Sequence, residues 1–186
     1  HRFAKRTFDL VVGSLLLIPA VPIMLLSALG IKLSSRGPVI FRQERIGRFG
    51  QPFWIYKFRT MHTEAPAYAS KPSAGSDMIF TWGRLLRKTS IDELPQLFNV
   101  LKGEMSLVGP RPDMPQIVTH YDATQRERLL VLPGMTGLWQ VSADRNYPIH
   151  ENLDYDLYYI EHQSVLLDLV ILIRTAYSVL RGVGAW

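Results

Sequence analysis

The sequence predicts a mostly helical α/β domain that associates with a membrane and contains amphipathic interfacial helices and one small β-hairpin. Three observations predict this fold class. Residues 10–30 carry no charge and are largely apolar, as expected of a membrane helix. Two short extended runs, 38–42 and 53–59, flank a glycine-containing turn, which is typical of a hairpin. Apolar residues recur at helical spacing over 94–101, and the run 164–180 is almost wholly apolar.

Residues 1–36 are expected to form a re-entrant membrane helix, and residues 37–186 to form one domain continuous with it. The apolar stretch would rise about 30 Å as a straight helix, enough to span a bilayer. Pro19 and Pro22 each remove a backbone hydrogen bond, so a break is expected near Pro22. Basic residues at both ends favour keeping both ends on the cytoplasmic side. A kinked transmembrane helix is the alternative.

Three other segments complete the expected membrane-facing surface. Asp9 precedes the apolar run and is expected at the interface, paired with Lys5 or Arg6. The basic segment Trp82–Lys88 fits an interfacial amphipathic helix and equally a solvated basic face. The apolar helix over 164–180 fits either a place in the interface or one closing the core.

Composition excludes several classes of site. The 186 residues include no cysteine, so disulfides, thiol catalysis and cysteine-bound zinc are excluded. The five histidines lack His-Glu-x-x-His spacing, and there is neither a P-loop nor a dinucleotide-binding glycine motif. The net charge of +5 fits anionic lipid headgroups or a phosphorylated substrate. No nucleic-acid-binding pattern is present, so nucleic acid is not expected as a partner.

Two adjacent carboxylates, Asp92 and Glu93, are predicted in the first turn of an amphipathic helix that ends at Gly103. The predicted buried face of this helix consists of Leu94, Leu97, Phe98 and Leu101. A plain alternative is that both carboxylates only stabilise the helix start, since Ser90 and Glu93 match a capping box.

The run Gly109-Pro-Arg-Pro112 follows this helix closely. Its two prolines restrict the backbone on both sides of Arg111. A guanidinium held in one place suits recognition of phosphate oxygens. The alternative is a rigid surface turn with a solvated arginine. Lys57 lies in the second strand of the predicted hairpin, where an ordinary solvated strand edge is the alternative.

Four runs carry a resemblance to a known family. They are PVIFRQERIG at 38–47, YKFRTM at 56–61, the segment from Leu86 to Pro112, and PGMTGLWQV at 133–141. In this order the chain resembles the bacterial sugar transferase family, the monotopic polyprenol-phosphate phosphoglycosyl transferases that begin the assembly of bacterial surface glycans. The resemblance covers nearly the whole chain.

The resemblance implies a two-step reaction. The aspartate of the family's Asp-Glu pair, which is similar in position to Asp92, attacks the sugar-linked phosphate of a UDP-sugar and releases UMP. A polyprenol phosphate then takes the phosphosugar from the aspartate. The resemblance further implies Mg²⁺ held by Asp92 and Glu93, support of the metal or of proton transfer by Glu93, phosphate binding by Arg111, and Lys57 as a further site residue.

The substrate loop is assigned less directly. Its implied contacts to the nucleotide or sugar are Pro133, Gly134, Thr136, Gly137 and Arg145. By its own residues, 132–141 is expected to form turns with exposed backbone. The chain departs from the family pattern here, with Leu132 in place of a basic residue, Met135 in place of isoleucine, and one extra residue in 142–146. These departures leave the donor sugar open.

The resemblance also implies a location and partners. It implies the bacterial inner membrane, with the catalytic domain on the cytoplasmic face and the helix broken at a proline that aligns with Pro22. UDP-sugar, undecaprenyl phosphate and the membrane are the implied partners, for exopolysaccharide, O-antigen or capsule synthesis; a homodimer is left open. The ending is similar to that of longer members with further helices upstream, so both a domain of such a protein and a minimal enzyme fit.

Two other functions are weighed against this one. A membrane-anchored scaffold would use the acidic helix and Arg111 only for structure. A direct glycosyltransferase would pass on the sugar alone and release UDP in place of UMP. The nucleotide product therefore separates the two enzyme classes.

Overall fold

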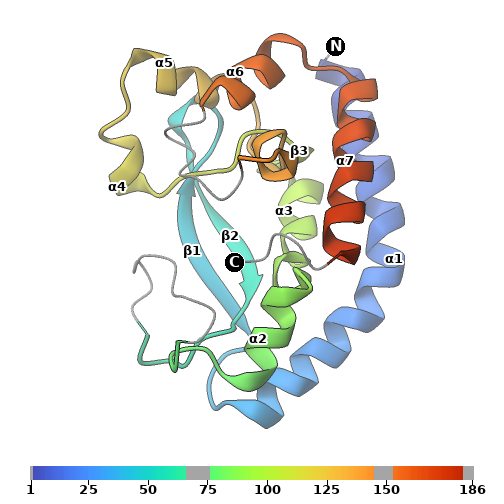
Figure 1. Cartoon of the computed structure of the whole chain (residues 1–186), viewed down its shortest axis with the longest axis vertical. Helices are drawn as coiled ribbons and strands as arrows, with labels where there is room; N and C mark the ends of the chain where they lie inside the picture. The colour runs from blue at the N-terminus through green and yellow to red at the C-terminus, as the bar shows by residue number, and fades with distance from the viewer. Residues whose placement is uncertain (1, 66–75, 145–152, 182–186) are drawn as a thin grey trace.

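A computed structural model describes residues 2–65, 76–144 and 153–181 (Figure 1). Along the chain, the elements are α1 (Arg2–Ser34), β1 (Ile40–Ile46), η1 (Arg48–Gly50), β2 (Pro52–Phe58), α2 (Thr81–Lys88), η2 (Ile91–Glu93), α3 (Gln96–Lys102), β3 (Ser106–Val108), α4 (Pro115–Val118), α5 (Ala123–Arg126), η3 (Glu127–Leu130), β4 (Gly134–Thr136), η4 (Trp139–Val141), α6 (Leu153–Glu161) and α7 (Val165–Leu180). Helix α1 lies along one side, and α2, α3 and α7 contact it. The hairpin lies beyond α3, so the domain is a mostly helical α/β fold, as predicted.

Helix α1 is continuous through Pro19 and Pro22. We expected a break near Pro22; the structure has instead one long helix that curves along its length (Figure 1). The two prolines lie within one turn of each other, so their missing hydrogen bonds fall together and the helix bends there. The re-entrant path stays a prediction.

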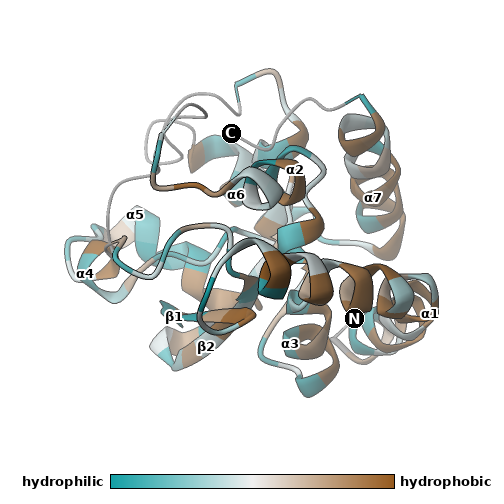
Figure 2. Ribbon diagram, turned by 90° about the horizontal axis from the view of Figure 1, so that it is seen from below, coloured by the Kyte–Doolittle hydropathy of each residue, from teal (hydrophilic) through white to brown (hydrophobic). Residues whose placement is uncertain are grey.

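One helix among the described residues, Phe3–Ser34, is long and apolar enough to cross a membrane, by length and composition alone. Its outer face remains exposed, and a second apolar face belongs to α7 (Figure 2). The most exposed apolar residues of the two helices are Phe3, Ile18, Leu25, Leu26, Leu33, Leu166 and Leu180. Exposed apolar area of this extent is typical of a membrane-associated protein.

The hairpin prediction is confirmed. Strands β1 and β2 pair antiparallel, with Phe41 opposite Lys57 and Ile46 opposite Pro52. The turn between them uses left-handed backbone at Phe49 and Gly50. Since side chains alternate along a strand, Phe53, Ile55 and the Lys57 side chain lie on one face of β2.

The helix predicted after the two carboxylates begins later than expected. Ser90 has a left-handed backbone (φ 56°) and makes no capping hydrogen bond, so the capping-box alternative is wrong. Asp92 and Glu93 lie in the short 3-10 turn η2, and α3 starts only after Pro95. Gly103 ends α3 with φ 86°, as predicted.

The buried face of α3 also differs from the prediction. Leu97 and Val100 are buried, but so are the polar Gln96 and Asn99, whereas Phe98 is 43% exposed. Helix α3 lies between α1 and β2. These two neighbours bury polar residues of α3 as well as apolar ones, and an apolar pattern does not select polar residues. Buried residues of α1, β2, α2, α3, β3, α6 and α7 form one core.

Residues 132–141 are more ordered than the turns we expected. They contain β4, which pairs in parallel with β3. Gly109 N–H donates to Thr136 O (2.9 Å) and Gly134 N–H donates to Pro110 O (2.9 Å). The pairing of two segments far apart in sequence therefore fixes the backbone directly before Arg111.

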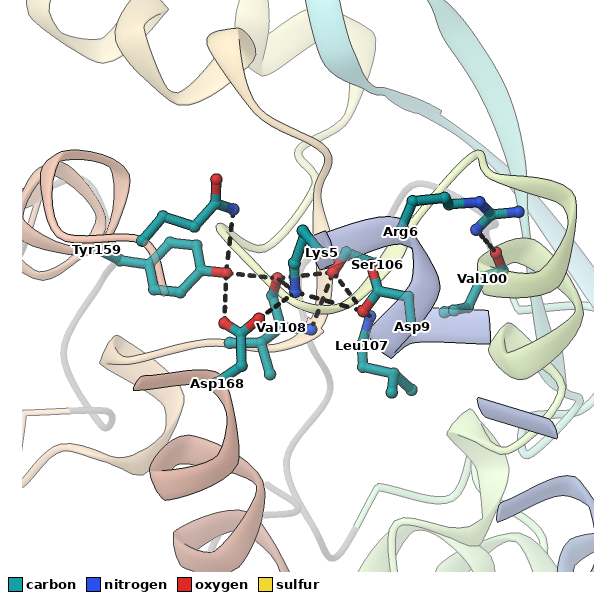
Figure 3. Close-up of polar contacts among 10 residues, drawn as sticks. Lys5, Arg6, Asp9, Val100, Ser106, Leu107, Val108, Tyr159 and Asp168 are labelled. Atoms are coloured by element: carbon teal, nitrogen blue, oxygen red, sulfur yellow. Dashed lines mark hydrogen bonds and ion pairs between the residues drawn. The ribbon is translucent and has the colours of Figure 1, made fainter. Parts of the chain in front are cut away.

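A buried ion cluster joins α1 to α7 and β3 (Figure 3). Lys5 Nζ donates to Asp9 Oδ1 (3.3 Å), Asp168 Oδ2 (2.6 Å) and Val108 O (3.2 Å). The Tyr159 hydroxyl donates to Asp168 Oδ1 (2.7 Å). The predicted pairing of Asp9 with Lys5 is confirmed, but Asp9 is fully buried in the domain and does not lie at an interface.

Arg6, the next residue, contacts a different element. Its guanidinium donates to Val100 O (2.6 Å) and Leu101 O (2.8 Å). These carbonyls belong to the last turn of α3, where a cation offsets the negative end of the helix dipole. The first turns of α1 are therefore bonded to α3, β3 and α7.

Replacing Lys5 with Ala should destabilise the fold strongly, because two buried carboxylates would lose their shared cation. We expect a loss of about 3–5 kcal/mol in the free energy of unfolding, measured by chemical denaturation in detergent. Lys32→Ala, at the exposed opposite end of α1, is the matched control and should change stability by about 0.5 kcal/mol or less. Equal effects of the two variants would contradict the importance of the cluster.

Candidate active site

Three segments meet at Glu93. Its Oε1 accepts a hydrogen bond from Lys57 Nζ (2.6 Å) on β2 and from Arg111 Nη2 (3.0 Å) after β3. Asp92 precedes Glu93 in η2, so the four residues singled out from the sequence come together. The Lys57 and Glu93 side chains are mostly buried, at 17% and 23% exposure.

The side chain of Arg128 is hydrogen-bonded to the segment that contains Arg111. This side chain donates from Nη2 to Arg111 O (2.8 Å), from Nη1 to Asp113 Oδ2 (2.7 Å), and from Nε to Asp156 Oδ2 (2.8 Å). Arg128 is buried, and Tyr121 completes the cluster through its hydroxyl. The Arg111 backbone is therefore fixed by a buried ionic network in addition to the two prolines.

The two neighbouring carboxylates differ electrostatically. Burial opposes ionisation of Glu93, but Lys57 and Arg111 outweigh it and hold the pKa of Glu93 well below its usual range. Burial and the adjacent Glu93 charge raise the pKa of Asp92 from 3.8 to about 6, although Lys57, Arg87 and Arg111 pull it downward. Adjacent carboxylates in one site commonly diverge in this way.

Hydrogen bonding follows the same division. Glu93 accepts from two cations, whereas the Asp92 carboxylate has no hydrogen-bond partner among the described residues. Asp92 is therefore a weakly stabilised carboxylate next to a strongly held one. Such a group is available to react with, or to bind, an incoming molecule.

Comparison with known proteins agrees with this geometry. The family described as Bacterial sugar transferase matches residues 1–182. The chain belongs to the bacterial sugar transferase family.

Curated relatives from several bacteria are similar over the chain. It is 44% identical to the UDP-glucose:undecaprenyl-phosphate glucose-1-phosphate transferase of Caulobacter vibrioides, over 98% of this chain and 72% of that protein. It is 41% identical to the undecaprenyl-phosphate galactose phosphotransferase of Salmonella typhimurium, over 100% of this chain and 42% of that protein. An Aeromonas hydrophila N-acetylgalactosaminephosphotransferase is 39% identical, with 45% of its length covered. The chain thus spans less than half the length of the last two relatives.

Arg87 lies close enough to the two carboxylates to interact with their charges, and our sequence reasoning did not select it. It lies on α2, and its charge interacts with those of Asp92 and Glu93. Its Nη1 atom is buried and has no hydrogen-bond partner within the described part of the chain. Burial lowers the pKa of Arg87, against the attraction of the two carboxylates. The available signal was a basic segment directly before the Asp-Glu pair, which we interpreted only as a membrane-facing or solvated helix.

Four of the predicted substrate-loop residues pack against the segment that leads to Arg111. These buried residues are Pro133, Gly134, Thr136 and Gly137. A Cβ atom at Gly134 would lie 2.1 Å from Gly109 N, so only glycine permits this approach. Their contact with a nucleotide or sugar stays a prediction. Arg145 lies outside the described residues.

The carboxylate pair fits a divalent cation in part. No cluster of three or more His, Cys, Asp or Glu side chains suited to a metal occurs among residues 2–65, 76–144 and 153–181. Mg²⁺ is commonly held by one or two carboxylates together with substrate phosphates and water. Asp92, without a hydrogen-bond partner in the described structure, and Glu93 are the residues that would supply the protein's share of such a site.

Substitutions of the two carboxylates should change stability in opposite directions. Because the pKa of Asp92 is raised in the fold, stability falls as the pH rises from 3.8 to about 6, and the full cost remains above that range. Asp92→Asn should therefore stabilise the chain at about pH 8, by up to about 3 kcal/mol, and have little effect at about pH 4.

Glu93→Gln is the matched variant. It removes the negative charge shared by Lys57 and Arg111, which weakens both hydrogen bonds, and should destabilise the chain by about 1–3 kcal/mol at about pH 8. Both effects are measured by denaturant unfolding in the presence of a metal chelator. Changes of the same sign in the two variants would contradict the division of roles between the carboxylates.

Proposed function

We propose that this chain transfers a sugar-1-phosphate from a UDP-sugar to undecaprenyl phosphate in the membrane, forming undecaprenyl-diphosphate-sugar and UMP. The observation that carries the proposal is the unequal state of the two carboxylates. Glu93 is held by Lys57 and Arg111, which leaves Asp92 as the carboxylate free to attack phosphorus. The names of the Caulobacter and Salmonella relatives describe the same class of transfer.

The proposed reaction has two displacements at one phosphorus atom. A carboxylate oxygen of Asp92 attacks the sugar-linked phosphorus of the UDP-sugar, the bond to the bridging oxygen breaks, and UMP leaves with that oxygen. An oxygen of undecaprenyl phosphate then attacks the same phosphorus, and the bond to Asp92 breaks. The carboxylate is regenerated, as covalent catalysis requires.

Three cations around Asp92 favour this chemistry. Lys57, Arg87 and Arg111 all attract its charge. Against two carboxylates they leave one net positive charge, which favours an anionic diphosphate in a partly buried site. Arg111, with its backbone held on both sides, is suited to contact phosphate oxygens as charge develops in the transition state. Glu93 keeps that arginine oriented in the resting site.

Mg²⁺ is proposed as the cofactor, with Asp92 and Glu93 as its protein ligands. A bound cation of this kind neutralises phosphate charge and reduces the repulsion between a diphosphate and an attacking carboxylate. The chain's own residues still orient the substrate and provide the nucleophile.

The donor sugar and pathway are proposed only by class. The names of the relatives mention glucose, galactose and N-acetylgalactosamine donors, so similarity to them does not select one sugar. A Sinorhizobium fredii relative is named an exopolysaccharide production protein. We therefore propose a role in the first membrane step of polysaccharide synthesis.

For the membrane, we propose that α1 enters one leaflet and returns, with the catalytic domain at the cytoplasmic face of the bacterial inner membrane. The exposed apolar face of α1 supports its insertion into the membrane, and the curved course of this helix, which contains Pro19 and Pro22, supports a path that returns to the same side (Figure 1). Lys5 and Arg6 at the start of α1, and Lys32 at its end, are basic residues that favour the cytoplasmic side. Anchoring of this kind keeps Asp92 near the lipid phosphates.

The covalent step is tested by intact mass spectrometry of the purified chain with Mg²⁺ and a panel of UDP-sugars, without lipid acceptor. We expect one phosphosugar to be added per chain, with UMP released. Asp92→Asn should show no adduct, because an amide is a far weaker nucleophile, and a chelator should prevent adduct formation. Asp122→Asn makes the same substitution at an exposed aspartate that caps α5; it is the matched control and should still form the adduct.

Other outcomes would contradict this mechanism in distinct ways. Release of UDP would show direct sugar transfer. UMP formed only when polyprenol phosphate is added, with no adduct detected by rapid quenching, would make Asp92 a metal ligand in place of a nucleophile. No nucleotide release from any donor would favour a binding protein.

The topology is tested by single-cysteine labelling, since the chain has no native cysteine. Ala4→Cys and Ser34→Cys place exposed thiols near the two ends of α1. In intact spheroplasts we expect both thiols to be protected from a membrane-impermeant maleimide, and in inverted vesicles we expect both to react. Labelling of only one thiol in each preparation would establish a transmembrane helix.

A further inference from the structure

The outer edge of β2 has an unusual partner. Within the described residues β2 pairs only with β1, which leaves the backbone groups of Trp54 and Tyr56 on the opposite edge without a strand. The side chain of Asn99 occupies that place. Its Oδ1 accepts the Tyr56 N–H (3.1 Å), and its Nδ2 donates to Trp54 O (2.7 Å). The amide thus makes the two hydrogen bonds that a neighbouring strand would make.

Asn99 is fully engaged and fully buried. Its second Nδ2 hydrogen bond goes to Glu104 Oε2 (2.7 Å), and the residue has 0% exposure. A buried amide with this set of partners has one favourable orientation, because each lost hydrogen bond would leave a buried polar group unpaired. The side chain therefore forms a rigid link between α3 and β2.

The backbone of Asn99 links the same point to a third segment. Its carbonyl accepts the N–H groups of Gly103, Glu104 and Met105 (3.1, 3.0 and 3.3 Å), which form the turn from α3 into β3. Strand β3 leads directly to Arg111. Asn99 lies in the helix that follows Glu93, and it is bonded both to the strand that carries Lys57 and to the turn that leads to Arg111.

We propose that Asn99 is a positioning residue of the active site: its amide closes the edge of β2 and thereby holds the Lys57 ammonium against Glu93. Lys57 follows Tyr56 directly, and its own position pairs with Phe41 of β1. The strand is therefore fixed on one edge by β1 and on the other by Asn99. This inference rests on the proposed transfer reaction only for its kinetic consequence, since the structural link can be measured without it.

The experiment compares four variants of the whole chain in detergent or nanodiscs. Asn99→Ala removes the link, and Val100→Ala removes buried methyl groups from the adjacent position of α3, where the side chain lies next to Gly13 of α1. Asn99→Asp keeps the acceptor for Tyr56 N–H but places a carboxylate beside Glu104. Asn99→Asp with Glu104→Gln removes that repulsion. The measurements are hydrogen exchange of the backbone amides of residues 53–58, denaturant unfolding, and the kcat and KM of UMP release.

We expect faster exchange at Tyr56 in Asn99→Ala but not in Val100→Ala. We expect kcat to fall about 10–100-fold in Asn99→Ala, because misplacement by an ångström can cost this much, while KM for the UDP-sugar changes less than about threefold. Val100→Ala should keep kcat within about threefold although it is destabilised. The double variant should recover most of the kcat lost in Asn99→Asp.

Two results would overturn the proposal. One is unchanged exchange at Tyr56 in Asn99→Ala, and the other is a kcat of Asn99→Ala no lower than that of Val100→Ala. If the unchanged chain releases no UMP with any donor, the proposed function fails, and the exchange comparison still decides whether Asn99 holds the strand that carries Lys57.

Discussion

The shared acceptor at Glu93 organises the site. One carboxylate oxygen receives both the Lys57 ammonium and the Arg111 guanidinium, so three segments converge on a single atom. This pairing also separates two chemically similar neighbours. Glu93 stays ionised because two cations offset its burial, whereas burial and the neighbouring Glu93 charge raise the pKa of Asp92. The two carboxylates therefore differ in pKa because Lys57 and Arg111 both bond to Glu93 and neither bonds to Asp92. The fold must position these two cations accurately.

Local sequence rules predicted the parts of this arrangement that depend on near neighbours. The alternation in β1 and β2 and the left-handed glycine at Gly103 follow from period and turn chemistry, and both are present. The left-handed Ser90 is a different case, because no local preference selects it for a serine. It delays the start of α3 and places Asp92 and Glu93 in a separate 3-10 turn. The turn η2 packs against β2, α2 and α1, which are distant or separate elements, and no pattern within the segment indicates this geometry.

The remaining parts depend on distant segments. Strands β3 and β4 are three residues each, too short for a recognisable period, and their pairing relies on close backbone approach at Gly109 and Gly134. The buried polar residues were missed for a related reason. Asn99 and Arg128 each depend in part on partners 15 to 45 residues away, and polar side chains are expected at the surface until those partners are known. The resemblance to the family suggested which groups react, but it did not explain what holds them.

The same long-range contacts connect the membrane helix to the chemistry. Lys5 is bonded to the carbonyl of Val108, two residues before Pro110, and Arg6 is bonded to the last turn of α3. The strand that leads to Arg111 and the helix that follows Glu93 are therefore both bonded to the first turns of α1. Since the cluster around Lys5 is buried and charged, it cannot loosen without exposing an uncompensated charge. In the proposed membrane arrangement, these contacts fix the distance between α1 and the site, and so the distance of Asp92 from the lipid phosphates, as the proposed transfer requires.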